Sequence, residues 1–144
     1  MFLDDLLKLA DAQESTVSVA STSHIDTLAK GDAYVPNFAY IRIDTAFTAG
    51  AGQPNASFKI QSSSSSTFAS DVNTLCESET LLASSLIAGK EYKLRLASGA
   101  KRYIRGYMTV GVHGGTAISD THKFGAGKFV IFLVTDVDID RNLA

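Results

Sequence analysis

Apolar and polar residues alternate along much of the chain, which is the pattern of β-strands that have one buried face. The segment 38–47 is typical, because Ala39, Ile41 and Ile43 share one face while aromatic and polar residues take the other. The same alternation recurs in three further segments, at 15–22, 56–62 and 91–97. This pattern predicts a protein that is built mainly of strands.

The segment 128–140 differs, because it begins with a continuous apolar run and ends in alternation. A continuous run is typical of a strand that is buried on both faces. Turns rich in Gly, Pro and Ser separate the strands, for example at 49–55 and in the serine-rich loop 61–71. Short strands divided by such turns favour an all-β fold, an antiparallel, jelly-roll-like β-sandwich.

Two segments leave the type of element open. Near the N-terminus, apolar residues recur at the three- and four-residue steps of an amphipathic helix: Phe2, Leu3, Leu6, Leu7, Leu9 and Ala10. They predict a short helix or arm over 1–14, docked on its own domain or on a partner, ahead of a β-sandwich domain over 15–144. The segment 71–89 fits a helix or two short strands, and its frequent Ser and Thr residues favour strands.

The composition is that of one globular domain. With 144 residues, of which 45% are hydrophobic, the chain is long enough to bury a core without a metal or a disulfide. The single cysteine, Cys76, cannot form an internal disulfide. A net charge of −2 argues against a general nucleic-acid-binding protein. We expect neither a secretory signal, because Asp4 and Asp5 stand where basic residues would be, nor a membrane span.

Residues that could bind metal or perform catalysis lack the required spacing. The histidines His24, His113 and His122 are not paired as zinc ligands are, and Asp120 with His122 is expected to be an exposed loop pair. The chain has no nucleophile motif and no phosphate-binding loop. We therefore expect no catalytic residue, no metal, no cofactor and no enzymatic activity.

Three alternating aspartates near the C-terminus, Asp136, Asp138 and Asp140, resemble the start of a calcium-binding loop. Such a loop needs Gly at its sixth position, where this chain has Arg141. The aspartates are therefore expected to form a solvated or arginine-paired face, and a weakly bound surface cation is the alternative.

The segment 101–112 combines basic residues with tyrosines, as RNA-binding strands do. Arg105, Gly106 and Tyr107 fit the strand motif of an RNA-recognition domain, but Thr109 stands where a stacking aromatic residue belongs. In a strand, Ile104, Met108, Val110 and Val112 would form an apolar face with Gly106, and the opposite face would carry Tyr103, Arg105, Tyr107 and Thr109. That second face resembles a protein interface, and the alternative is tyrosines and arginines that merely cover a sheet.

Four segments resemble, in the same order, the jelly-roll capsid cement (decoration) proteins of some tailed bacteriophages. They are FLDDLLKLADAQ at 2–13, STSHID at 21–26, FKIQSSSSSTF at 58–68 and KRYIRGYMTVGV at 101–112. The resemblance implies a structural virion protein that binds the outer surface of the capsid as a homotrimer and clamps neighbouring subunits of the major capsid protein. Three modest contacts per trimer would add up to tight attachment.

With this function in view, the candidate partner-binding residues are Phe2, Leu3, Leu6, Leu7, Arg102, Arg105 and Tyr107. The expected partner is the major capsid protein, with no role for nucleic acid or membrane. Deleting residues 1–12 is expected to weaken capsid binding and to leave the sandwich folded. The alternative is a jelly-roll module that binds carbohydrate or a host surface, although the absence of Trp argues against a sugar site.

Overall fold

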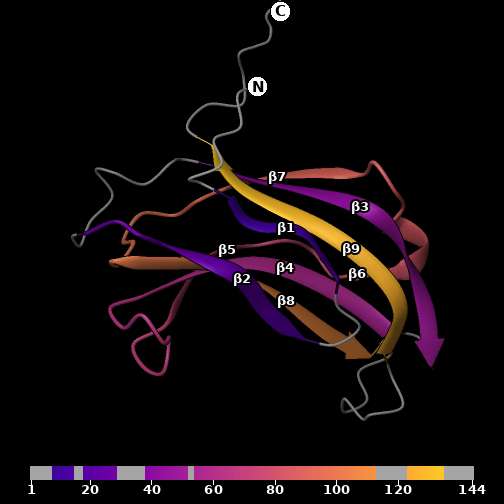
Figure 1. Ribbon diagram of the computed structural model, residues 1–144, viewed down its shortest axis with the longest axis horizontal. Helices are drawn as coiled ribbons and strands as arrows, with labels where there is room; N and C mark the ends of the chain where they lie inside the picture. Colours follow the sequence, from indigo (N-terminus) through magenta and orange to yellow (C-terminus); the bar gives the residue numbers. More distant parts are fainter. Residues whose placement is uncertain (1–7, 15–17, 29–37, 52–53, 113–122, 135–144) are drawn as a thin grey trace, which may run out of the picture.

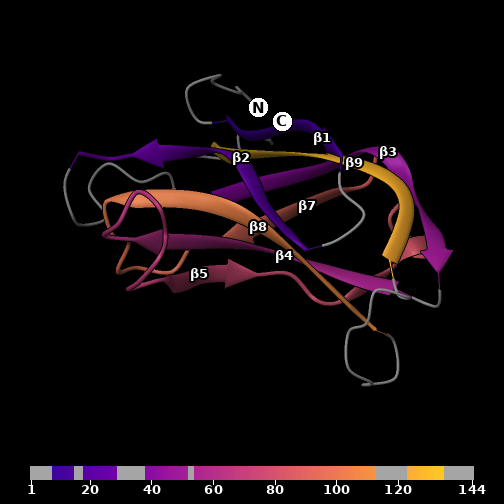
Figure 2. The ribbon, with the colours of Figure 1, turned by 60° about the horizontal axis from the view of Figure 1, so that its bottom comes forward.

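The computed structural model describes residues 8–14, 18–28, 38–51, 54–112 and 123–134. These residues form two antiparallel β-sheets that pack face to face (Figures 1 and 2). The four-stranded sheet has the order β1 (Lys8–Glu14), β9 (Lys123–Val134), β3 (Phe38–Ala51) and β7 (Glu91–Arg95). The five-stranded sheet has the order β2 (Val19–Asp26), β8 (Tyr103–Val112), β4 (Pro54–Ser63) and β5 (Asn73–Glu77), with β6 (Leu81–Leu82) also on β4.

Strand pairing is nested. The strand β1 pairs with β9, β2 with β8, β3 with β7 and β4 with β5, so the first half of the chain folds back along the second half. This arrangement confirms the predicted antiparallel β-sandwich. The nested order is compatible with its jelly-roll form, in which one long hairpin is rolled into two sheets.

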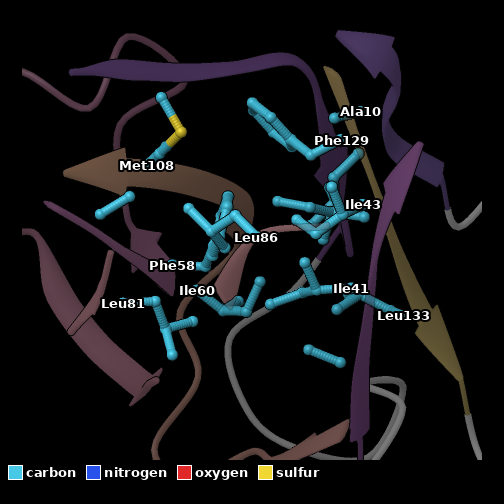
Figure 3. Packing of buried hydrophobic residues seen from close by; sticks show 14 of the residues in the cluster. Ala10, Ile41, Ile43, Phe58, Ile60, Leu81, Leu86, Met108, Phe129 and Leu133 are labelled. Carbon is cyan, nitrogen blue, oxygen red and sulfur yellow. The ribbon is translucent and has the colours of Figure 1, made fainter. Parts of the chain in front are cut away.

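The core lies between the two sheets and is built from the alternation that the sequence predicted. Figure 3 shows side chains of both sheets that point toward one another. The rings of Phe58 on β4 and Phe129 on β9 lie 5.3 Å apart, centroid to centroid. Ile41 and Ile43 are completely buried in this layer, as predicted for β3. Burial of these apolar side chains removes their surface from water, and this hydrophobic effect is the main contribution to the free energy that holds the two sheets together.

The strand β9 is buried on both faces over Phe129–Val134. Phe129, Ile131 and Leu133 enter the core between the sheets. Val130, Phe132 and Val134 form a second apolar cluster with Tyr40 on the opposite face of the four-stranded sheet. This confirms the prediction that the continuous apolar run forms a strand buried on both faces.

The segment 71–89 also follows the prediction, because it forms the short strands β5 and β6 rather than an α-helix. A 3₁₀ turn over Ala83–Ser85 follows β6 and is the one helical element within the described residues. Leu75, Leu81 and Leu86 are buried in the core from these elements.

The predicted N-terminal helix is wrong for Lys8–Glu14, which form the strand β1, while residues 1–7 lie outside the described residues. The backbone of this segment pairs with the edge of β9, and the register shifts twice, between Lys8 and Ala10 and between Ala10 and Gln13. Ala12, inside the second shift, has a left-handed φ of 47°. Because of these bulges, Leu9, Ala10 and Gln13 are all buried. The spacing of these buried positions is the same as that on the apolar face of a helix.

Gln13, a buried polar residue, links the edge strands β1 and β2 of the two sheets. Its side-chain nitrogen donates a hydrogen bond to the carbonyl oxygen of Ala20 at 2.9 Å, and its side-chain oxygen accepts one from the backbone N–H of Thr22 at 2.9 Å. Both partners belong to β2, which is the edge strand of the five-stranded sheet. The polar side chain therefore replaces ladder hydrogen bonds where the backbone of β1 cannot provide them.

Gly127 on β9 allows the ring of Phe47 on β3 to lie against the backbone. A Cβ atom at Gly127 would lie 2.5 Å from the Phe47 ring, and the φ of Gly127 is 153°. We predict that Gly127→Ala lowers the free energy of unfolding by about 2–4 kcal/mol, because it adds an overpacked contact to backbone strain.

Chemical denaturation of the Gly127→Ala protein measures this loss. The matched control is Gly89→Ala, where φ is 85° but no atom lies within 4 Å of the new Cβ. This control separates backbone strain from the contact with the ring, and we expect a smaller loss of about 1 kcal/mol. Equal losses in the two variants would contradict the role assigned to the Phe47 ring.

Candidate protein-binding face

The outer surface of the five-stranded sheet carries a cluster of aromatic and basic side chains. On β8, Tyr103, Arg105 and Tyr107 are half-buried and point away from the core, as the sequence predicted. The register places Lys59 opposite Tyr107 and Gln61 opposite Arg105 on β4. We call this cluster the Tyr–Arg face and define it by seven residues: His24, Lys59, Gln61, Phe68, Tyr103, Arg105 and Tyr107.

Arg105 lies at the centre of the Tyr–Arg face. Its guanidinium carbon is 4.4 Å from the ring centroid of Phe68 and 5.3 Å from that of Tyr107. Its Nε donates a hydrogen bond to Oε1 of Gln61 at 2.9 Å. Partial burial lowers the pKa of Arg105, and none of the described carboxylates forms an ion pair with it. Two aromatic rings and one amide therefore hold this cation in place.

Phe68 reaches Arg105 from the serine-rich loop between β4 and β5, which projects at the lower left of Figure 1. The ring is buried, and the residue has a left-handed φ of 56°. Its backbone N–H donates to the carbonyl oxygen of Ser65 at 3.1 Å. This placement could not be predicted from the sequence, because Phe68 and Arg105 belong to separate segments of the chain.

Serine hydroxyls hold the loop in this conformation. Ser63, which is buried, donates to the carbonyl oxygen of Ser70 at 2.7 Å and accepts from the N–H of Ser65 at 3.0 Å. Ser64 donates to the carboxylate of Asp71 at 2.7 Å. These hydroxyls replace the ladder hydrogen bonds that the backbone lacks in this segment.

The loop is also tied to the start of β8. Ser62 donates to Oδ1 of Asn73 at 2.5 Å and accepts from the backbone N–H of Lys101 at 3.2 Å. The Lys101 ammonium lies 2.5 Å from Oδ1 of Asp71, whose φ is a left-handed 58°. These contacts fix the loop against the strand that carries Arg105.

Arg102, which was predicted to bind a partner, is engaged within the chain. Its Nε and Nη2 atoms donate to the two carboxylate oxygens of Asp26 at 2.7 and 2.9 Å, which ties the end of β2 to the start of β8. Asp26 also accepts from the N–H of Leu28 at 2.8 Å. The Arg102 hydrogen bond, followed by that of Leu28, lowers the pKa of Asp26 to about 2.

Tyr107, the other predicted contact on β8, lies between two cations. The Lys59 ammonium is 5.6 Å from its ring centroid, and the Arg105 guanidinium is 5.3 Å from it. Lys59 also lies 4.0 Å from the carboxylate of Glu77. Two cations of the protein itself therefore lie over the ring of this half-buried tyrosine.

The remaining predicted residues do not form a site in the described part of the chain. Phe2, Leu3, Leu6 and Leu7 lie outside the described residues, as do His113, His122, Asp120, Asp136, Asp138 and Asp140. His24 is exposed, with its ring edge-on to those of Tyr103 and Phe68. Within the described ranges, no three His, Cys, Asp or Glu residues are close enough to hold a metal ion. Burial raises the pKa of Cys76 to about 11, so its thiol stays protonated at neutral pH.

Sequence comparison assigns the chain to a family. The family model described as Bbp16 matches residues 9–133, which extend from β1 to β9. The chain belongs to the Bbp16 family. The matched residues include all seven that define the Tyr–Arg face, so this face lies within the part of the chain that the Bbp16 model describes. No curated protein matches the chain.

Structure comparison matches this member of the Bbp16 family to a chain from "Structure of infectious bursal disease virus Gx strain". The two share 12% sequence identity with a TM-score of 0.40. The match covers 91% of this chain and 32% of the viral chain, so the protein spans about a third of the length of that chain. Among the described residues, no helix is long and apolar enough to cross a membrane.

The Asp26–Arg102 pair gives the protein an acid-sensitive link. Because the pKa of Asp26 is lowered from 3.8 to about 2, the stabilisation is complete above pH 3.8 and is lost as the pH falls toward 2. We predict that Asp26→Asn is less stable than the unmodified protein at pH 6 and that the difference disappears near pH 2.

Urea denaturation midpoints at several pH values test this prediction, with Glu14→Gln, an exposed substitution at the end of β1, as the control. A stability difference between the Asp26→Asn and unmodified proteins that stays constant from pH 6 to pH 2 would contradict it.

Proposed function

We propose that this protein is a structural, non-enzymatic component of a virion that binds the outer surface of a capsid and clamps neighbouring subunits of the major capsid protein. The proposal rests on the resemblance of four segments to capsid cement proteins and on where the fold places them. The other candidate, a carbohydrate- or host-binding module, has less support.

The observation that carries the proposal is the convergence of three of these segments on one sheet. Residues 21–26 belong to β2, residues 58–68 to β4 and the serine-rich loop, and residues 101–112 to the start and length of β8. The three strands are neighbours in the sheet, and the three segments together supply every residue of the Tyr–Arg face, with Phe68 coming from the loop. The outward-facing residues of these three segments thus form one continuous surface, while their inward-facing residues belong to the core.

The chemistry of the Tyr–Arg face suits contact with another protein. Tyrosine and arginine are the residues that contribute most often to the centres of protein interfaces. Sugar binding usually needs a free aromatic ring, whereas cations lie over the rings of Phe68, Tyr103 and Tyr107. The contacts that hold these side chains also reduce the entropy lost on binding.

The apolar N-terminal residues are the second proposed contact, and the structure changes how they should be tested. Deleting residues 1–12 would remove Leu9 and Ala10 from the core and would damage the sandwich itself. A cleaner variant replaces Phe2, Leu3, Leu6 and Leu7 with Ser and keeps β1 intact.

We predict that this fourfold variant keeps the thermal stability of the unmodified protein but decorates heads assembled without the protein at clearly lower occupancy, because it lacks the apolar anchor. Co-sedimentation followed by quantitative electrophoresis measures the occupancy. The control replaces Asp4 and Asp5 with Ser in the same segment. Occupancy equal to that of the unmodified protein would remove the anchor from the proposal, and failure of the unmodified protein to bind heads would refute the function.

We also propose that the protein forms a homotrimer, which can be tested separately. Three copies would bind the shell through three linked contacts, and such linkage raises the overall affinity without any new contact. We expect light scattering of the purified protein to report about three times the mass of the 15.3 kDa chain. A mass of one chain over the accessible concentration range would contradict a stable free trimer.

A further inference from the structure

We propose that Arg105 is the docking point for a carboxylate group of a protein partner, and that Phe68 holds the arginine in position for it. The identity of the partner rests on the proposed function, whereas the carboxylate chemistry rests on the geometry of the Tyr–Arg face alone. This proposal gives Arg105 and Arg102 different roles, although the sequence offered both as partner-binding residues.

The unused hydrogen-bonding capacity of Arg105 is the first argument. A guanidinium has five N–H groups in one plane. Nε uses one of them on Gln61, and none of the described residues accepts a hydrogen bond from the two terminal nitrogens. Those nitrogens present the edge that matches the two oxygens of a carboxylate in a bidentate pair.

The balance of charge on the sheet is the second argument. Arg102 is paired with Asp26 and Lys101 with Asp71, and the Lys59 ammonium lies near the carboxylate of Glu77. Arg105 differs from these cations, because it is partly desolvated and has no carboxylate partner within the described residues. A cation held in this state gains from a partner that brings the missing charge.

The partner that fits is a protein rather than a nucleic acid. Nucleic-acid binding draws most of its affinity from several phosphate contacts at once, whereas Arg105 is a single cation on a surface where Lys59 and Arg102 already lie near the carboxylates of Glu77 and Asp26. The rings of Phe68 and Tyr107, which lie over the guanidinium group of Arg105, match the aromatic surroundings of an arginine at the centre of a protein interface. An aspartate or glutamate side chain therefore fits best.

Phe68 acts as a positioning residue. Its ring lies 4.4 Å from the guanidinium carbon, and the serine hydroxyls of its loop fix its backbone. Without this ring, the guanidinium would keep its charge but would lose one of the two surfaces that define its plane. The charge would then remain attractive while the bidentate geometry would become rare.

A side-chain NMR titration of the full chain tests the carboxylate. The probe is a blocked tetraglutamate peptide, and the signal followed is the Nε–Hε group of Arg105, assigned by its loss in Arg105→Lys. We expect a saturable shift with tetraglutamate and none with a blocked tetraglutamine peptide at equal ionic strength. No shift with tetraglutamate, or an equal shift with tetraglutamine, would overturn the proposal.

Variants of Arg105 and Phe68 test whether this site contributes to capsid binding. Arg105→Lys keeps the charge but not the planar fork, and we expect it to bind heads about tenfold more weakly or worse. Phe68→Leu should weaken tetraglutamate binding about threefold or more and move the Arg105 signal before any peptide is added. Arg95→Ala, which removes an exposed arginine from β7 on the other sheet, should match the unmodified protein.

The two proposals fail in different ways. If the unmodified protein binds heads and folded Arg105→Lys binds them equally well, the carboxylate dock is wrong and the capsid function stands. If tetraglutamate shifts the Arg105 signal but the unmodified protein does not bind heads, the dock stands and the capsid function is wrong. Circular dichroism and thermal unfolding of each variant show whether it is folded.

Discussion

Burial of one face of β8 against the opposite sheet is the constraint on which the rest of the structure depends. Ile104, Met108 and Val110 belong to the apolar layer between the sheets. Because side chains alternate along a strand, their burial directs Arg105 and Tyr107 outward. A shift of one residue in the register of β8 would place the charged and aromatic side chains in the core and the apolar ones in water. The packing that holds the sandwich together therefore also orients its candidate binding face.

Hydrophobic packing does not by itself place the guanidinium of Arg105. The loop that carries Phe68 is held by hydroxyl groups, and the nearby charges are paired one by one, as in Asp26 with Arg102 and Asp71 with Lys101. Exposed ion pairs of this kind contribute only about 0–1 kcal/mol to stability. Their main effect here is to hold the loop and the strand ends in place and to neutralise the nearby cations. Arg105 is thereby left as the cation that a partner's carboxylate can bind.

The proposed role in a protein shell would use these same properties. The face is a surface on a sheet that packs against a second sheet, and its side chains are already held by contacts within the chain. Binding through such a surface loses little conformational entropy, and several linked copies would multiply a modest contact. The Bbp16 family model matches residues 9–133, which include the strands β2, β4 and β8 that carry the Tyr–Arg face.

Alternation within single segments was enough to predict most of the strands and the outward direction of Arg105, because a period of two is a local property of the chain. The same reasoning failed over residues 8–14, where bulges beside β9 bury neighbouring residues in a spacing that also suits a helix. It also did not predict the contact of Phe68 with Arg105 or the hydrogen bonds of the serine-rich loop. The partners of the serine hydroxyls depend on the path of the loop, which the local sequence pattern does not reveal.

By itself, then, the sequence determined the β-sandwich class, the apolar run of β9 and the two faces of β8. Only the tertiary structure decided that Phe68 lies on Arg105 and that Asp26 takes up the charge of Arg102. Those contacts depend on the register between strands that are far apart in the chain, and the burial of the whole core sets that register.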